Sequence, residues 1–211
     1  MSFEDVSARM AAAAAESGRP TSDITLIVVS KGRPPEAIRT LYESGHRDFG
    51  ENRAQELAGK TPQLPGDIRW HFVGPLQRNK VSLVRPRVVS LHSLDRVRLA
   101  AAWVGGDGPA PPAMLEINLA AEPQKHGFAP AAAMEAADQI IELGVDLEGV
   151  MAIPPHGERA TPYFERLVAL RDDLAVRHPA ITEVSAGMSE DYEEAIKAGA
   201  TTIRVGRAIF E

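Results

Sequence analysis

Lys31 is the residue of this chain best placed for covalent chemistry, because it follows the apolar, β-branched run Ile24 to Ser30 and precedes Gly32. Such a run predicts a buried strand, so Lys31 should lie at a strand's carboxyl end, where α/β proteins hold their functional groups. A lysine beside apolar neighbours loses hydration, and the neutral amine this favours can attack a carbonyl to form a Schiff base. The alternative is a solvated lysine just beyond a strand, where most lysines lie.

A candidate anion site lies near the end of the sequence. Gly187-Met188-Ser189 precedes a predicted helix whose free N–H groups would favour a phosphate, and Gly206-Arg207 follows a predicted strand. In (β/α)8 barrels a phosphate commonly binds after the seventh and eighth strands. The alternative is that Ser189 only caps the helix and that Gly206 only serves a turn.

Arg204 lies within the last predicted strand, two residues before Gly206. Because side chains alternate along a strand, Arg204 points inward if Ile203 and Val205 face the helices. A buried guanidinium needs a partner. A salt bridge with Glu116 or contact with a bound ligand would provide one, and the two are compatible.

Short apolar runs alternate with helical patterns along most of the chain. Without two-residue hairpin signals, this alternation predicts a parallel sheet. The predicted strands are 25–30, 48–50, 70–73, 88–92, 114–118, 147–153, 182–185 and 202–205, and the predicted helices are 35–44, 52–60, 79–84, 94–104, 129–143, 162–177 and 190–198. Eight strands favour a closed (β/α)8 TIM barrel over an open doubly wound sheet.

We expect residues 1–211 to form a single domain with an extra N-terminal helix over residues 1–17. That helix should cover the barrel wall, because no helix is predicted after Val205. Ser189 is the expected N-cap of the helix that follows it, and Pro162 suits a first helical position. The stretch from Gly105 to Pro112 reads as a loop before the fifth strand.

Composition excludes several classes of function. A net charge of −6 argues against a nucleic-acid surface, and the absence of cysteine rules out disulfides and thiolate chemistry. No two of the six histidines are four residues apart, so we expect no metal site. The N-terminus lacks the features of a signal peptide and no segment predicts a membrane span, so we expect a cytoplasmic protein.

A lysine at the barrel mouth, a phosphate cradle opposite and an inward arginine between them suggest pyridoxal 5′-phosphate as the ligand. The chain resembles, nearly end to end, the YggS/PROSC family of pyridoxal phosphate homeostasis proteins. The resemblance is carried by Val29-Ser30-Lys31, Phe49-Gly50-Glu51-Asn52, the segment from Trp70 to Gln77 with Asn79-Lys80, the segment from Gly149 to Pro154, Gly187-Met188-Ser189, and Arg204-Val205-Gly206 with Ile209-Phe210.

The resemblance implies a barrel of fold type III, like the N-terminal domain of alanine racemase, with Lys31 forming the Schiff base. It also implies that Ser189, Gly206 and the backbone at Arg207 hold the phosphate. Arg204 would then face the pyridine nitrogen, and Asn52 would lie near the ring. The chain departs from the family pattern at Ala186, at Arg207 and over residues 124–127, which affects the edges of the pocket.

The first functional hypothesis is a carrier or buffer of pyridoxal phosphate without turnover and with no catalytic residue. An arginine opposite the pyridine nitrogen can only donate hydrogen bonds, so it cannot accept one from a protonated nitrogen. The nitrogen should therefore stay neutral, and a neutral nitrogen makes the cofactor a weaker electron sink. Since the sequence stops at Glu211, we expect the chain to lack the domain that gives racemases their tyrosine base. The resemblance also places Ile153 where racemases have a histidine. Expected partners are the cofactor and apo enzymes that use it, and the resemblance suggests a monomer.

Two enzymatic alternatives remain open. One is a small amino-acid racemase that depends on pyridoxal phosphate, and the other is a cofactor-free aldolase that uses Lys31. His71 is predicted to be a hydrogen-bonded core histidine rather than a catalytic base. Lys80, Arg78 and Lys125 receive no role.

Overall fold

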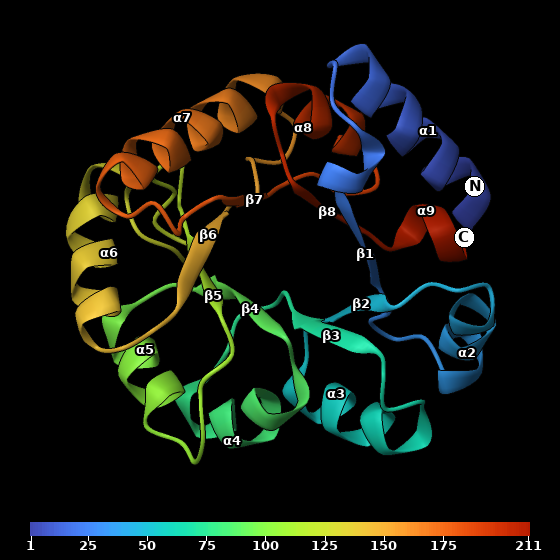
Figure 1. Ribbon diagram of the computed structural model, residues 1–211, viewed down its shortest axis with the longest axis horizontal. Helices are drawn as coiled ribbons and strands as arrows, with labels where there is room; N and C mark the ends of the chain where they lie inside the picture. Colours follow the sequence, from blue (N-terminus) through green and yellow to red (C-terminus); the bar gives the residue numbers. More distant parts are fainter.

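The computed structural model describes all residues, 1–211, and contains eight parallel strands that close into one barrel (Figure 1). Each strand pairs with the next in sequence, and β8 closes the barrel by pairing with β1, with Leu26 opposite Ile203. The strands are β1 Thr25–Val29, β2 Asp48–Glu51, β3 Arg69–Phe72, β4 Ser90–Leu94, β5 Ala113–Glu116, β6 Leu147–Met151, β7 Glu183–Ser185 and β8 Thr202–Val205. The predicted (β/α)8 barrel is confirmed, and every predicted strand is present.

The helices form a ring outside the strands (Figure 1). They are α1 Phe3–Glu16, α2 Pro35–Glu43, α3 Ala54–Lys60, α4 Val81–Val84, α5 Val97–Val104, α6 Ala133–Glu142, α7 Thr161–Arg177, α8 Tyr192–Ala198 and α9 Arg207–Phe210. The helices α3, α4, α5, α6 and α8 begin later than predicted. None of them has a side-chain hydrogen bond at its N-cap, so their sequences carry no strong signal for the first residue.

The N-terminal helix α1 forms as expected. Ser2 and Asp5 build a capping box at its start, and Val6, Met10 and Ala13 bury one face at helical spacing. That face packs against α8 and α9 on the outside of the barrel (Figure 1).

A short helix, α9, follows β8, so the prediction that no helix follows Val205 was wrong. With four residues, α9 is too short to show a helical repeat of apolar residues. Thr161 and not Pro162 is the first residue of α7. The stretch from Gly105 to Pro112 is a loop as predicted, and the Trp103 indole anchors it by donating a hydrogen bond to the Pro111 carbonyl at 2.8 Å.

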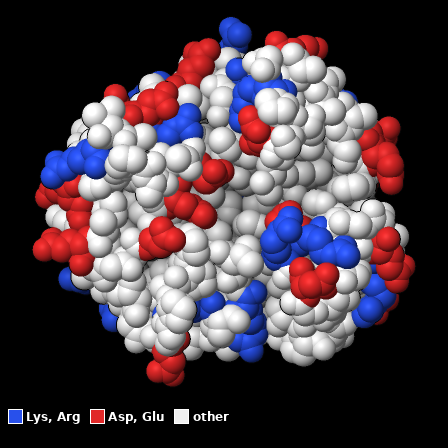
Figure 2. Space-filling view, viewed as in Figure 1, with Lys and Arg blue, Asp and Glu red and all other residues white.

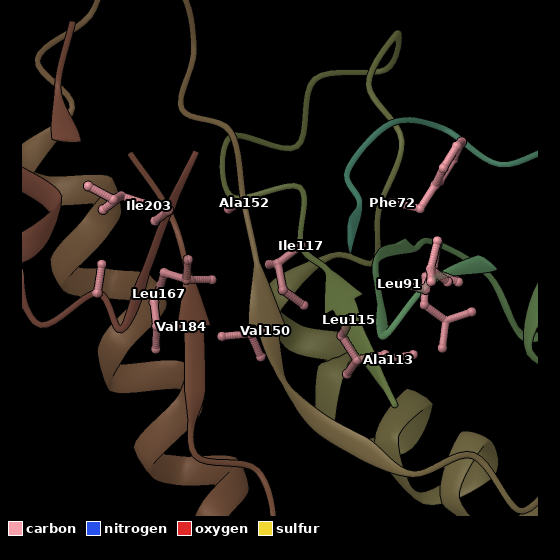
Figure 3. Close-up of a cluster of buried hydrophobic side chains, with 14 of the residues drawn as sticks. Phe72, Leu91, Ala113, Leu115, Ile117, Val150, Ala152, Leu167, Val184 and Ile203 are labelled. Atoms are coloured by element: carbon pink, nitrogen blue, oxygen red, sulfur yellow. The ribbon is translucent and has the colours of Figure 1, made fainter. Parts of the chain in front are cut away.

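The buried residues fall into two regions. An apolar cluster of 47 buried residues fills the space between strands and helices, and includes Ile203 and Val205 of β8. Figure 3 shows part of this cluster, with Ile203 among the labelled residues. Ile27, Met114 and Met151 are also buried but lie outside that cluster. Since strand side chains alternate, these three face the barrel interior. Buried polar side chains share that interior and lead to the site.

Candidate functional site

A cavity of about 700 Å³ opens at the carboxyl ends of the strands. The molecule viewed along the barrel is hollowed at its centre, with acidic groups on one side of the hollow and basic groups next to acidic ones on the other (Figure 2). All six residues predicted from the sequence line this cavity: Lys31, Asn52, Ser189, Arg204, Gly206 and Arg207. The barrel thus brings together residues from both ends of the chain.

Lys31 lies two residues after Val29, the last residue of β1, and lines the cavity, as the strand pattern predicted. Its side chain is exposed, however, so the expected apolar surroundings are wrong. The turn that carries it needs Gly32, whose φ of +70° lies in the left-handed region that favours glycine. Lys31 therefore reaches the solvent-filled mouth rather than the core.

A buried cluster fixes the backbone on both sides of Lys31. The Lys60 ammonium donates to the Ser30 carbonyl at 2.7 Å, to Glu51 Oε1 at 2.5 Å and to Glu56 Oε1 at 2.7 Å. The N–H of Gly32 donates to the same Glu56 oxygen at 2.5 Å. Residues 30 and 32 are thereby tied to α3 and β2, which limits where Lys31 can move.

The sequence analysis missed this cluster. Glu51 is fully buried, and burial raises the pKa of its carboxyl while hydrogen bonding to Lys60 and the charge of Lys60 oppose that rise. The sequence did offer one signal for this cluster: a glutamate at the end of a buried strand and a lysine nine residues later. Sequence spacing alone does not show that their side chains meet.

Ser189 does not cap a helix, so that prediction was wrong. Helix α8 begins three residues later at Tyr192, and the Ser189 hydroxyl accepts a hydrogen bond from the N–H of Ala208 at 3.2 Å. This bond ties the loop after β7 to the start of α9. The N–H groups of Gly206 and Arg207 donate no hydrogen bond within the chain, so they are available to an anion in the cavity.

Two glycines allow close packing of the loops after β7 and β8. Gly187 has a φ of +89°, and a Cβ there would lie 2.8 Å from the Tyr192 Cα. A Cβ at Gly206 would lie 2.8 Å from the carbonyl oxygen of Val29, two residues before Lys31. Without a side chain, Gly187 lets the loop after β7 pack against α8, and Gly206 lets the loop after β8 lie against the end of β1.

Arg204 points into the barrel. The salt bridge with Glu116, one of the two alternatives for its partner, is absent: no carboxylate lies within 4.0 Å of its guanidinium. Its Nη1 donates to the Ser185 hydroxyl at 2.5 Å and its Nη2 to the Ala152 carbonyl at 3.1 Å. Burial lowers the pKa of Arg204 to about 10, so it stays charged at neutral pH. Neutral oxygen acceptors thus hold a buried cation at the cavity wall.

Asn52 follows β2 and lines the cavity from the side of Lys31. Its side-chain oxygen is buried and has no hydrogen-bond partner within the chain. Unpaired buried oxygens are rare in folded proteins because their desolvation costs free energy. The Arg207 side chain, by contrast, is exposed and pairs with Glu190 at 2.6 Å, so only its backbone remains for the cavity.

Glu116 has an unusual protonation equilibrium. Burial and the nearby Asp95 charge raise its pKa to about 7, against the opposing charges of His126 and Arg204. A carboxyl whose pKa is higher in the folded chain binds protons more tightly when folded. Its contribution to stability therefore falls as pH rises from its unfolded pKa of about 4.5 through about 7.

We expect Glu116→Gln to remove this dependence. The free energy of unfolding of the variant relative to the wild type should rise from about pH 4 to about pH 8. The rise should be at most about 3 kcal/mol, since one pKa unit corresponds to about 1.4 kcal/mol. Urea unfolding of both proteins at the two pH values measures it. An equal difference in unfolding free energy at both values would contradict the assignment.

The chain contains no group of three or more histidine, cysteine, aspartate or glutamate residues that could hold a metal ion. None of its helices has the length and apolarity needed to cross a membrane.

Comparison with known proteins gives a consistent picture. Residues 8–211 match the family model described as the alanine racemase N-terminal domain. The chain is 39% identical to the pyridoxal phosphate homeostasis protein of Pseudomonas aeruginosa, over 97% of this chain and 91% of the relative. It is 38% identical to the protein of the same name from Aquifex aeolicus, over 96% of this chain and 92% of the relative.

A solved structure supports the same relationship. The structure of PipY of Synechococcus elongatus with PLP bound has a TM-score of 0.79 and 33% sequence identity to this chain. The match covers 98% of this chain and 100% of the PipY chain. The match in sequence and in the closed barrel extends over almost the whole chain. The chain therefore belongs to the alanine racemase N-terminal domain family, among the pyridoxal phosphate homeostasis proteins.

Proposed function

We propose that this chain binds pyridoxal 5′-phosphate through a Schiff base on Lys31 and acts in intracellular pyridoxal phosphate homeostasis, as a carrier or buffer without turnover. The observation that carries the proposal is the single cavity lined by all six predicted residues. The names of the relatives and the PLP-bound structure of PipY support it.

The groups in the cavity fit this cofactor. Lys31 supplies the amine for its aldehyde, and the Ser189 hydroxyl with the free N–H groups of Gly206 and Arg207 supplies donors for its phosphate. The orphaned oxygen of Asn52 can accept a hydrogen bond from a bound ligand. The volume of about 700 Å³ lies within the range of small-molecule sites.

Arg204 supports a role without turnover. When bound, pyridoxal phosphate supplies an electron sink, and the sink is deepest when its ring nitrogen is protonated. A charged guanidinium has only donors, so Arg204 opposite that nitrogen disfavours its protonation.

Three further features belong to the proposal. Residues 1–211 act as one cofactor-binding domain, supported by the single closed barrel. The working form is a cytoplasmic monomer. Its partners are apo enzymes that require pyridoxal phosphate, to which it delivers the cofactor.

An absorbance titration of the purified protein with pyridoxal 5′-phosphate tests the proposal. We expect a visible Schiff-base band that saturates at one cofactor per chain and disappears on reaction with hydroxylamine. A chain that forms no Schiff-base band with excess cofactor would exclude the Schiff base on Lys31 and favour the aldolase alternative.

The family match keeps racemisation as the second candidate. Incubating the loaded protein with D- or L-alanine, followed by chiral analysis, separates the two functions. We expect no steady interconversion. Sustained racemisation at ordinary enzyme rates would replace the carrier assignment with an enzymatic one.

A further inference from the structure

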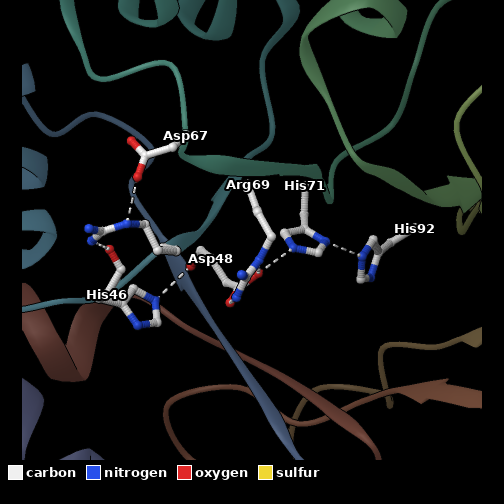
Figure 4. A network of polar contacts seen from close by, with 7 residues as sticks. His46, Asp48, Asp67, Arg69, His71 and His92 are labelled. Atoms are coloured by element: carbon white, nitrogen blue, oxygen red, sulfur yellow. Dashed lines mark hydrogen bonds and ion pairs between the residues drawn. The ribbon is translucent and has the colours of Figure 1, made fainter.

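A line of hydrogen bonds leads from the cavity through the barrel interior to its opposite end. Ser185 Oγ, which accepts from Arg204, lies 2.8 Å from His92 Nδ1. His92 Nε2 lies 3.1 Å from His71 Nδ1, and His71 Nε2 lies 3.1 Å from Asp48 Oδ1. Figure 4 shows the two imidazole rings between β3 and β4, with Asp48 beside them at the start of β2.

The two ends of this line fix the direction of every bond. Arg204 can only donate, so Ser185 Oγ is an acceptor there, and its own proton is free for His92 Nδ1. At the other end the Asp48 carboxylate only accepts, since hydrogen bonds from His71 and Arg69 and the charge of Arg69 outweigh burial and hold its pKa well below the usual value. His71 Nε2 therefore donates to Asp48.

Only one arrangement between these ends satisfies every polar atom. His92 accepts at Nδ1 and donates from Nε2, and His71 accepts at Nδ1 from that N–H. If His92 donated to Ser185 instead, the buried hydroxyl proton of Ser185 would have no acceptor within the chain, which costs free energy. Both rings thus carry their proton on Nε2.

The surroundings of His92 agree with an uncharged ring. His92 is fully buried, and burial together with the nearby Arg204 charge lowers its pKa well below the usual value. Its two nitrogens face only Ser185 and His71, neither of which is a carboxylate. A positive charge on His92 would lie close to that of Arg204 without compensation.

We propose that Ser185, His92, His71 and Asp48 are positioning residues that hold the Arg204 guanidinium in one orientation at the cavity wall. The inference deepens the proposed function and rests on it. Ser185 Oγ accepts a hydrogen bond from Nη1 of Arg204, and the Ala152 carbonyl accepts one from Nη2. The hydrogen bonds that run from Ser185 to Asp48 keep the Ser185 side chain from rotating. The remaining Arg204 donors then face the bound cofactor as a fixed set.

A matched pair of variants at Ser185 tests the proposal. Ser185→Thr and Ser185→Val add nearly the same volume, but only threonine keeps the hydroxyl. We expect the valine variant to bind pyridoxal 5′-phosphate on the order of tenfold more weakly than the threonine variant, because a hydrogen bond to a charged group is lost. Its bound-cofactor absorption band should also shift, while that of the threonine variant keeps the wild-type position.

A second pair probes the distant end of the line. Asp48 does not line the cavity, so any effect on the cofactor must pass through the bonded side chains. Asp48→Asn keeps an oxygen that can accept from His71, whereas Asp48→Leu removes it. We expect the leucine variant to shift the cofactor band and the asparagine variant to keep it, with thermal unfolding checking that both fold.

The cofactor-free protein gives an independent measurement. Nitrogen-15 chemical shifts of the imidazoles should report the Nε2–H tautomer for both His71 and His92 at neutral pH. An Nδ1–H tautomer or a charged ring at His92 would overturn the bond direction.

If the wild type forms the cofactor band but the valine and threonine variants match in affinity and band position, the positioning role fails while the proposed function stands. If the wild type forms no band, the proposed function fails and the positioning role falls with it.

Discussion

Lys31→Ala should abolish the visible absorption band that the wild-type protein forms with pyridoxal 5′-phosphate. Alanine has no amine, and no other lysine lines the cavity, so no Schiff base can form there. Lys31 is exposed and packs in no core, so its removal should leave the thermal unfolding midpoint nearly unchanged. Absorbance titration and thermal unfolding of the same sample measure the two effects separately.

Lys197→Ala is a matched control for this experiment. Lys197 is also exposed, forms only a surface ion pair with Glu16 at 2.5 Å, and lies outside the cavity. Its variant should give the wild-type band. A Lys31→Ala protein that still forms a band removable by hydroxylamine would show that another amine carries the cofactor, and would contradict the assignment of Lys31.

The position of Lys31 was predictable because it depends on local pattern alone. The run before it is apolar and β-branched, β1 forms there, and the parity of the strand places Lys31 at the barrel mouth. The same argument placed Arg204 inward, between Ile203 and Val205 of the outer core. Pattern along one strand settles which face a residue occupies.

The partners of those residues were not predictable in the same way. For Arg204 the sequence offered Glu116 or a bound ligand as partner, but its hydroxyl partner within the chain comes from β7. Which interior residues meet depends on the stagger of strands around a closed barrel, and that stagger is set by all eight strands together. The pairing of His71 with His92 depends on the register between β3 and β4 in the same way.

The phosphate segment was predicted in part. Its residues do converge on the cavity, but Ser189 was expected to cap a helix and instead accepts from the N–H of Ala208. The cause is α9, a short helix that carries no periodic signal yet brings Ala208 against the loop after β7. In this barrel the short helix α9 thus gives Ser189 a different hydrogen-bond partner from the one expected, while the order of the strands is as predicted.

The largest loss of stability is expected from Lys60→Met. The substitution would leave Glu51, which is fully buried, without the ammonium that lies 2.5 Å from its Oε1. Its Oε2 already lacks a partner within the chain. Removing one partner of a buried ion pair typically costs about 3 to 5 kcal/mol, because the other charge remains desolvated. Urea unfolding at neutral pH should show a loss of that size.

The pH dependence of this loss follows from Glu51. Without Lys60, burial raises the pKa of the Glu51 carboxyl further, so the folded variant takes up a proton more readily than the unfolded chain. A raised carboxyl pKa destabilises the fold as pH rises above the unfolded value. The deficit of Lys60→Met should therefore be smaller in mild acid than at neutral pH, and an equal deficit at both would contradict the ion-pair explanation.

The double variant Lys60→Met/Glu51→Leu separates a lost charge partner from a lost packing contact. It removes both charges and replaces them with apolar groups, which in buried pairs is often neutral or stabilising. It should recover most of the stability lost in Lys60→Met. Since the Lys60 ammonium also holds the Ser30 carbonyl, the double variant should still show a less ordered Lys31 turn and slower Schiff-base formation. Wild-type kinetics in that variant would mean that β1 alone positions Lys31.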